Sequence, residues 1–362
     1  MKEQNYIQTW VEIDKKAFAS NLKKIKTFAK GAEIIPVLKA DAYGHGAVEL
    51  AKEVQNMGFI RIAVFSMQEG IELRNAGIHI AILMLNPVEP VEALNTAVEN
   101  FLVPTILDIK SLDFFDSIAK KQKRLLPFHL EVDTGMGRTG LSVSDTYDFL
   151  GEINKRKYAK MTGMYSHFAV SDTDKKFTQK QFEQFHAISR CARLKYDMRF
   201  ISHIASSVGI LKSKKYHLDA VRPGISLYEG GQPVLTWKTK IAYIKKVPSG
   251  FGISYGRTFI TKKPSVIAAI PIGYCDGYNR LLSNKGFVLI KGKRCPVTGR
   301  VTMNMTMIDI SALKNAAVGD EVVLLGRQGK QEVSAKEIAD ICKTISYEIF
   351  CNISPRIKRI MV

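Results

Sequence analysis

The chain has 362 residues, of which 46% are hydrophobic and 24% charged, a balance typical of a folded globular protein. Its formal net charge is +19, but its basic clusters are short, scattered pairs without interleaved aromatic residues, which argues against a nucleic-acid partner. The sequence has no apolar run of membrane-spanning length and no signal peptide, so we expect a cytoplasmic protein without a membrane partner. The five cysteines form no Cys-x-x-Cys pair, which argues against a disulfide framework and against a metal site.

A capped helix and a series of strands are predicted in the first two-thirds of the chain. Asp14 is a suitable N-cap, and four apolar residues follow at the spacing of one helix face: Phe18, Leu22, Ile25 and Ala29. Eight apolar runs typical of buried strands come next, most of them separated by helical patterns. They cover residues 34–38, 60–66, 78–85, 101–106, 128–133, 161–167, 200–206 and 219–225. Eight strand–helix units predict an α/β fold of the (β/α)8 TIM-barrel type.

The pattern changes near residues 230–233, where Gly and Pro indicate a linker. Beyond the linker, the segments are rich in β-formers and punctuated by Gly and Pro, with one helix near 333–343. The predicted β segments are 235–247, 265–272, 286–292 and 305–310. We therefore expect three parts: an N-terminal strand (1–12) packed with the C-terminal domain, the barrel (13–232), and a mainly-β domain (233–362).

Reactive groups of such barrels lie at the carboxyl ends of the strands, and Lys39 ends the first one. Burying an unpaired ammonium is costly, and desolvation lowers the pKa of a lysine amine until it is a usable nucleophile or base. A lone lysine could equally extend to the solvent at the rim. Ser207 follows the seventh strand and Gly224 lies near the end of the eighth, where barrels often bind a phosphate, although both could also be ordinary turn residues.

Residues 37–46 (VLKADAYGHG) closely resemble the lysine motif of the alanine racemase family, whose members bind pyridoxal 5'-phosphate (PLP). Further matching motifs follow in that family's order: 132–140 (VDTGMGRTG), 165–169 (YSHFA), 221–225 (VRPGI), 252–257 (GISYGR), 271–277 (PIGYCDG) and 299–304 (GRVTMN). The resemblance extends from about residue 8 to the C-terminus. It implies a PLP-dependent isomerase with a barrel and a β domain that racemises a small amino-acid substrate, alanine, and supplies D-alanine for peptidoglycan.

The resemblance also implies two catalytic bases, one on each face of the substrate's α-carbon. Lys39 holds PLP and serves one face, while Tyr255 serves the other. In the family the tyrosine comes from the neighbouring subunit, which implies a homodimer with shared active sites.

Binding roles are implied for further residues of this sequence. The resemblance assigns the PLP phosphate to Tyr43, Ser207, Gly224 and Ile225. Arg222 would face the pyridine nitrogen, and His167 would bind the cofactor and orient Arg222. The substrate would meet Arg138, which also contacts the cofactor, the Met303 backbone, and Tyr274 at the entrance of the site.

The sequence departs from the family pattern at four positions. Glu131 stands where many members have a carbamylated lysine, and we hypothesise that its carboxylate holds Arg138 directly. Ser206, Asn304 and Pro355 replace an asparagine, an aspartate and a tyrosine that many members carry. None of these departures removes a proposed catalytic group.

Three alternative functions remain open from the sequence. A racemase of serine or of broad specificity would share every motif, because one methylene or hydroxyl changes selectivity by only a few kcal/mol. A non-catalytic PLP-binding protein would keep the barrel and the lysine but lack the β domain with Tyr255. A barrel-type amino-acid decarboxylase would have both domains, but the motifs around Arg222 and Tyr255 fit it less well.

Overall fold

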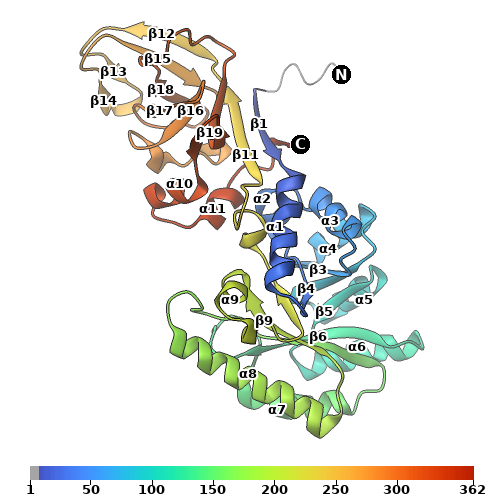
Figure 1. Ribbon diagram of the computed structural model, residues 1–362. Coiled ribbons are helices and arrows are strands. Elements are labelled where there is room, and N and C mark those ends of the chain that lie inside the picture. The colour runs from blue at the N-terminus through green and yellow to red at the C-terminus, as the bar shows by residue number, and fades with distance from the viewer. Residues whose placement is uncertain (1–7) are drawn as a thin grey trace. The chain divides into compact units, whose positions relative to one another are not determined.

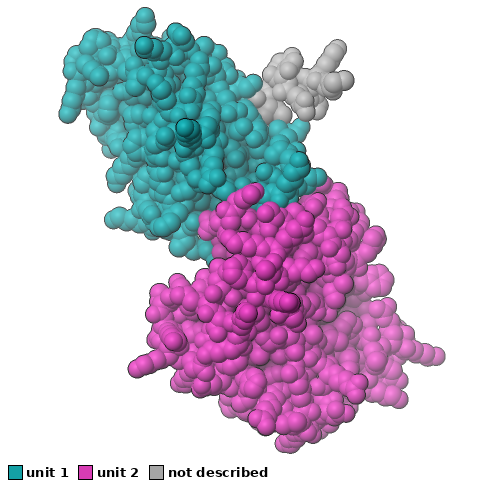
Figure 2. All heavy atoms as spheres, viewed as in Figure 1, with its two compact units in different colours: residues 1–17, 43–46, 233–362 teal, residues 18–42, 47–232 magenta. Residues whose placement is uncertain are grey.

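The computed structural model describes residues 8–362 in two compact units (Figures 1 and 2). One unit contains residues 18–42 and 47–232, and the other contains 8–17, 43–46 and 233–362. Residues 1–7, on which the expected start of the N-terminal strand and the expected absence of a signal peptide depend, lie outside the described residues.

Eight parallel strands form a nearly closed barrel in the first unit. In spatial order they are β2 (Glu33–Ile34), β10 (Ala220–Arg222), β9 (Ile201–Ser206), β8 (Ala159–Tyr165), β6 (Leu126–Asp133), β5 (Leu102–Thr105), β4 (Ala81–Pro87) and β3 (Arg61–Val64). The ring is completed just beyond β2, where Leu38 N–H donates to Ala63 O at 2.8 Å and Ala63 N–H donates to Pro36 O at 2.9 Å. All eight predicted strands and the predicted barrel class are confirmed.

Helices alternate with these strands (Figure 1). They are α1 (Lys15–Phe28), α2 (Lys39–Gly44), α3 (Ala47–Asn56), α4 (Met67–Asn75), α5 (Leu94–Glu99), α6 (Ile109–Lys121), α7 (Val143–Asn154), α8 (Lys175–Tyr196) and α9 (Ser207–Lys212). The predicted cap of α1 is confirmed, because Asp14 Oδ1 accepts the N–H of Ala17 at 2.9 Å. The four apolar residues of its predicted face are buried. A short strand, β7 (Leu141–Ser142), adds to β6.

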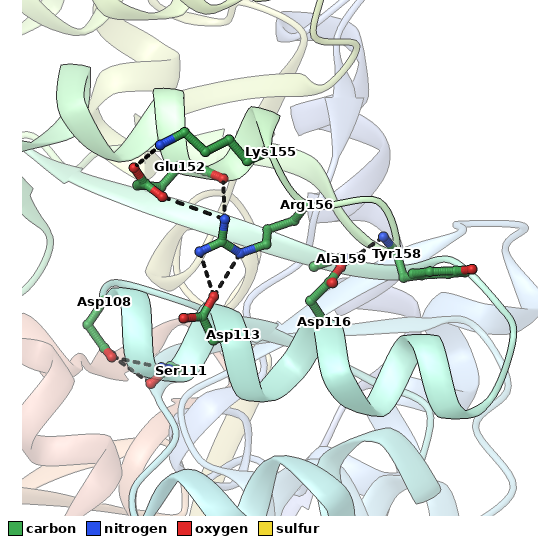
Figure 3. Close-up of polar contacts among 9 residues, drawn as sticks. All are labelled: Asp108, Ser111, Asp113, Asp116, Glu152, Lys155, Arg156, Tyr158 and Ala159. Carbon is green, nitrogen blue, oxygen red and sulfur yellow. Dashed lines mark hydrogen bonds and ion pairs between the residues drawn. The ribbon is translucent and has the colours of Figure 1, made fainter.

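Polar contacts fix α6 against the segment that leads into β8 (Figure 3). The Arg156 guanidinium binds the Asp113 carboxylate, and Asp116 Oδ1 accepts the N–H groups of Tyr158 and Ala159 at 2.8 and 2.7 Å. Because these acceptors lie on one helix face, they set where β8 begins. His167 follows the end of that strand by two residues.

The second unit is mainly β. Its larger sheet has the order β17 (Lys293–Pro296), β16 (Phe287–Ile290), β19 (Glu321–Gln328), β11 (Leu235–Lys240), β1 (Thr9–Ile13) and β21 (Lys358–Met361), with β20 (Gln331–Val333) beside β19. A second sheet contains β12 (Tyr243–Val247), β15 (Ser265–Ile270) and β18 (Thr306–Asp309), and a small hairpin pairs β13 (Gly252–Ile253) with β14 (Phe259–Ile260). The predicted mainly-β domain is confirmed.

Two details of this unit differ from the sequence prediction. The run 235–247 forms two strands that belong to different sheets, because the chain turns at Ile241 and Ala242. A second helix, α11 (Ser346–Cys351), follows the predicted one, α10 (Ala335–Cys342). Within residues 8–362, every helix is too short or too polar to cross a membrane.

Candidate active site

The barrel unit carries most of the predicted site residues at the carboxyl ends of its strands, where barrel enzymes place their chemistry. They are Lys39, Arg138, His167, Ser207, Arg222, Gly224 and Ile225. Lys39 comes directly after the bridge that completes the ring, and Arg222 ends β10.

The backbone after Lys39 forms a left-handed turn. Residues 40–43 are not glycines, yet their φ angles are 52–56°. This conformation costs roughly 1–2 kcal/mol for each residue with a Cβ atom. Such strain persists only where other contacts hold the backbone, and it is concentrated at functional sites.

One of these contacts is the carboxylate of Glu69. Its Oε1 accepts the N–H of Ala40 at 2.6 Å, and its Oε2 accepts those of Phe65 and Ser66 at 2.7 and 2.9 Å. Ser66 Oγ in turn accepts the N–H of Glu69, which makes a capping box at the start of α4. The carboxylate therefore joins the turn after Lys39 to the end of β3.

Arg222 lies buried among neutral acceptors. One terminal nitrogen, Nη1, donates to His203 O at 2.9 Å and to His203 Nδ1. The other, Nη2, donates to Ser166 O at 2.6 Å and to His167 Nδ1 at 3.4 Å. The guanidinium also lies over the Tyr165 ring, 5.0 Å from its centre.

The charges of this cluster follow from its burial. Burial lowers the pKa of Arg222 to about 10, so the guanidinium is still charged at neutral pH. Burial and the neighbouring Arg222 lower the pKa of His167 to about 3, so this imidazole is neutral. Because Arg222 can only donate, the hydrogen of neutral His167 lies on Nε2.

Hydrogen-bond donors converge on the buried hydroxyl of Ser207. Its Oγ lies 3.0 Å from Gly224 N, 3.2 Å from Ser226 N and 3.0 Å from Ser226 Oγ. A hydroxyl oxygen has only two lone pairs, so these three donors exceed what it can accept. The surplus suits an anion with several oxygens, such as a phosphate.

Glu131 and Arg138 have different environments. Glu131 is buried in the barrel, and burial raises its pKa against the opposing effects of a hydrogen bond from Thr139 and of the charges of Arg222 and Arg138. Its Oε2 has no hydrogen-bond partner within residues 8–362. Arg138 is exposed on a loop whose start is folded around the Asp133 carboxylate. No hydrogen bond or ion pair joins Glu131 to Arg138 in the described part of the chain.

Three other predicted residues lie on neighbouring loops of the β unit. Tyr255, Tyr274 and Met303 are 71%, 44% and 55% exposed. Tyr274 N–H donates to Thr302 O at 3.0 Å, which joins the second and third loops. The residue before Tyr255 joins the first loop to the third, because Ser254 Oγ donates to the carbonyl of Arg300 at 2.6 Å.

Tyr43 belongs to the same compact unit as these loops. Its side chain is buried with its ring 5.8 Å from that of Tyr347, and burial raises its pKa, so the phenol is neutral. Near Tyr274, a hollow of about 540 Å³ is lined in part by Arg280 and Pro355. Asn304 donates to Cys275 Sγ at 3.0 Å, a bond that an aspartate could not donate.

Comparison with known proteins agrees with this arrangement. The family model described as "Alanine racemase, N-terminal domain" matches residues 13–232, and that described as "Alanine racemase, C-terminal domain" matches residues 234–361. The chain belongs to the alanine racemase family. It is 40% identical to the alanine racemase of Halothermothrix orenii, over 97% of this chain and 96% of that protein. It is 39% identical to the alanine racemase of Carboxydothermus hydrogenoformans, over 98% of this chain and 99% of that protein.

Solved structures of alanine racemases have the same fold. That from Clostridium difficile 630 is 35% identical, with a TM-score of 0.90 over 98% of this chain and 96% of that one. The Bacillus anthracis alanine racemase with bound L-Ala-P is 34% identical, with a TM-score of 0.89 over 99% of this chain and 95% of that one. The recognised family, an isomerase family, is confirmed.

Alanine racemases use PLP, and the barrel residues fit this group. The surplus donors around Ser207 match its phosphate. The bonds of Arg222 occupy both terminal nitrogens and leave its Nε–H as the one guanidinium N–H group without a partner among residues 8–362. That N–H can donate to an unprotonated ring nitrogen such as that of PLP.

Sequence reasoning missed several residues of this site. Glu69 could have been found, because Ser66 and Glu69 have the spacing of a capping box. Ser226 and His203 gave no such signal. Their roles depend on contacts with Ser207 and Arg222, each 19 residues away in the chain.

The buried imidazole of His167 makes stability depend on pH. Its folded-state pKa lies below the ordinary histidine value of 6.5, so the unfolded chain binds a proton that the folded chain does not. The stabilisation is therefore present above pH 6.5 and is lost as the pH falls. Between pH 6 and pH 4, the free energy of unfolding should fall by about 1.4 kcal/mol per pH unit more steeply than in His167→Gln. Urea unfolding of both proteins measures this difference, and parallel pH curves would contradict it.

Proposed function

We propose that the chain interconverts L-alanine and D-alanine with PLP as its cofactor. Its relatives named alanine racemase support this activity. The observation that carries the proposal is the buried guanidinium of Arg222, which keeps one N–H group unused at the same barrel end as Lys39. PLP, when bound, withdraws electrons from the α-carbon of an attached amino acid and makes its proton removable.

Eight residues would hold the cofactor in this proposal: Lys39, Tyr43, Arg138, His167, Ser207, Arg222, Gly224 and Ile225. The strained turn held by Glu69 would aim the Lys39 amine. The donors around Ser207 would bind the phosphate, and Arg222 would donate its Nε–H to the ring nitrogen. A guanidinium keeps its own proton at neutral pH, so it would leave that nitrogen unprotonated.

Two bases would move the proton. The Lys39 amine would take it from one face of the α-carbon, and the Tyr255 phenol would return one to the opposite face. For the reverse direction the two groups exchange roles. The Nε2–H of neutral His167 could hold the tyrosine oxygen in place.

We propose that Tyr255 acts in the site of a second copy of the chain, as a homodimer with shared sites. The exposure of the tyrosine supports this, since 71% of it is open to solvent. Tyr274 and Met303 beside it are also exposed, and clustered exposed aromatic and apolar side chains mark interaction surfaces. A base that acts on a desolvated substrate must itself be shielded from solvent, and a second copy of the chain would shield this tyrosine.

The substrate carboxylate would bind to the Arg138 guanidinium and to the N–H of Met303. Tyr274, which is 44% exposed, would stand at the entrance of the site. We propose that Glu131 keeps Arg138 in position by its charge, which the unpaired buried Oε2 supports.

The remaining proposals concern organisation and cellular role. We propose a division into residues 1–12, 13–232 and 233–362, which the pairing of β1 with β11 and β21 supports. The supply of D-alanine to peptidoglycan and the cytoplasmic location rest on the family relationship alone.

A panel of three substrates in D2O tests the activity. L-alanine should lose its α-proton and its optical rotation together, and L-serine should react about 10- to 200-fold more slowly because of one hydroxyl. L-lysine should not react. NMR and polarimetry follow all three. A yellow protein that leaves all three untouched would support a PLP-binding role, and CO2 release would support a decarboxylase.

Mixing two inactive variants tests the shared site. Lys39→Ala and Tyr255→Phe should each be inactive alone. Unfolded together and refolded, half of the dimers should be mixed, each with one intact site, which restores about one quarter of the wild-type rate. The control is each variant refolded alone. No recovery in a mixture that forms dimers would contradict a shared site.

Replacement of Glu131 by glutamine tests its proposed charge. Glu131→Gln keeps the shape but removes the charge near Arg138, so KM for alanine should rise about tenfold. Glu183→Gln, which changes an exposed carboxylate on α8, is the control. Unchanged KM and rate in Glu131→Gln would refute the role.

A further inference from the structure

Two fully buried histidines lie inside the barrel next to Arg222. His203 comes from β9 and His129 from β6, and their Nε2 and Nδ1 atoms are 3.2 Å apart. The ring planes are inclined by 51°. Tyr165 stacks on His203, with ring centres 5.2 Å apart and planes within 7°. We call His129 and His203 the histidine pair.

The charge of Arg222 fixes the tautomer of both rings. Arg222 Nη1 can only donate, so His203 Nδ1 must accept and carries no hydrogen. The hydrogen of neutral His203 is then on Nε2, where it donates to His129 Nδ1. His129 must therefore also carry its hydrogen on Nε2. That N–H has no hydrogen-bond partner within residues 8–362.

The surroundings keep both rings neutral. Arg222 faces the pair from β10 and Arg61 from β3, where it is paired with Glu33 at 2.5 Å. Tyr165 of β8 is a phenol whose pKa is raised by burial. Burial and the two arginines lower the pKa of His129 to about 3 and that of His203 well below its usual value. An imidazolium here would lack its acceptor atom and repel the guanidinium.

The position of His129 depends on a glycine of the neighbouring strand. A Cβ atom on Gly163 would lie 2.2 Å from His129 Cε1 and 2.4 Å from both ring nitrogens. Such distances are impossible, so the ring occupies the space that any other residue would fill. The φ angle of Gly163 is not in the left-handed region. An alanine there would act on the histidine ring and not on the backbone.

We propose that the histidine pair is a positioning device for Arg222, in which His129 orients His203 and His203 holds the guanidinium. This inference rests on the proposed function only in taking Arg222 to face the cofactor. Because both rings are neutral, they hold the guanidinium and leave its positive charge uncompensated. A carboxylate in the same place would cancel that charge. Loss of the His129 acceptor would leave the buried Nε2–H of His203 unpaired, which favours rotation of His203 away from Arg222.

The tautomers are measured by NMR of the full-length protein labelled with 15N-histidine, with and without cofactor. Both rings should be neutral, with hydrogen on Nε2, and should not titrate between pH 5 and pH 9. His186, which is exposed on α8, serves as the reference histidine outside the barrel interior. Titration of either buried ring in this range, or a hydrogen on Nδ1, would overturn the proposal.

Two variants disturb the pair in different ways. His129→Leu removes the acceptor, and Gly163→Ala keeps the imidazole but displaces it. In the full chain without cofactor, each should increase hydrogen exchange at the Arg222 guanidinium roughly tenfold, the effect of about one hydrogen bond. In the loaded enzyme, kcat should fall by a similar factor while KM for alanine stays constant, because the pair does not contact the substrate.

His217→Leu is the matched control. This histidine is also buried, but its Nε2 contacts Ile210 O at 2.9 Å and not Arg222. It should reduce stability without changing exchange at Arg222. Equal hydrogen exchange at Arg222 in all three variants would overturn the proposal. If His129→Leu does not fold, Gly163→Ala decides alone, and unchanged exchange at Arg222 in that variant would overturn the proposal.

The results separate this inference from the proposed function. A wild-type protein that has the expected tautomers but does not racemise alanine would refute the function and leave the pair's role intact. A wild-type protein that racemises alanine but has a titrating His203 would refute the pair's role alone.

Discussion

A guanidinium charge buried without a hydrogen-bonded carboxylate constrains the interior of the barrel. Burying an ion costs several kcal/mol unless polar groups replace its water, and Arg222 finds these groups on the ends of neighbouring strands. The strands must therefore be in one register: Tyr165 lies opposite His203, and Arg222 lies opposite Ser206. A shift of one residue would turn each of these side chains to the other face of its strand. The same register fixes the positions of His167 and Ser207, which follow the carboxyl ends of β8 and β9.

The barrel was predictable from the sequence because its strands are buried on both faces. Such strands form continuous apolar runs, and each run found in the sequence corresponds to a strand. The β unit was predictable only in outline. Its hairpin strands β13 and β14 have two residues each, too few for a periodic pattern, and the division of 235–247 between sheets depends on partners far away in the chain. The helix α11 has only six residues, and Ile349 and Phe350 alone do not distinguish a helix from a loop.

The candidate site was predictable where a residue type contradicts its surroundings or belongs to a recognisable motif. A lysine at the end of an apolar strand is such a contradiction, and the motif around Lys39 then assigned its role. The supporting residues are of another kind. His129 and His203 stand within apolar strands, where a lone histidine is ordinarily a structural residue. Their importance depends on which side chains the barrel brings opposite each other, and no local pattern encodes that.

The proposed bases have opposite local environments, and this difference connects catalysis to assembly. The backbone at Lys39 is held in a strained turn by the Glu69 carboxylate, which suits a group that must remain aimed at one atom. Tyr255 is exposed on a loop of the β unit, and a solvated phenol interacts weakly with charges around it. Covering that loop with a second copy would exclude water and strengthen each polar contact of the tyrosine. On this proposal, a single chain has what it needs to bind the cofactor, but the proton transfer on the second face becomes efficient only once two chains meet.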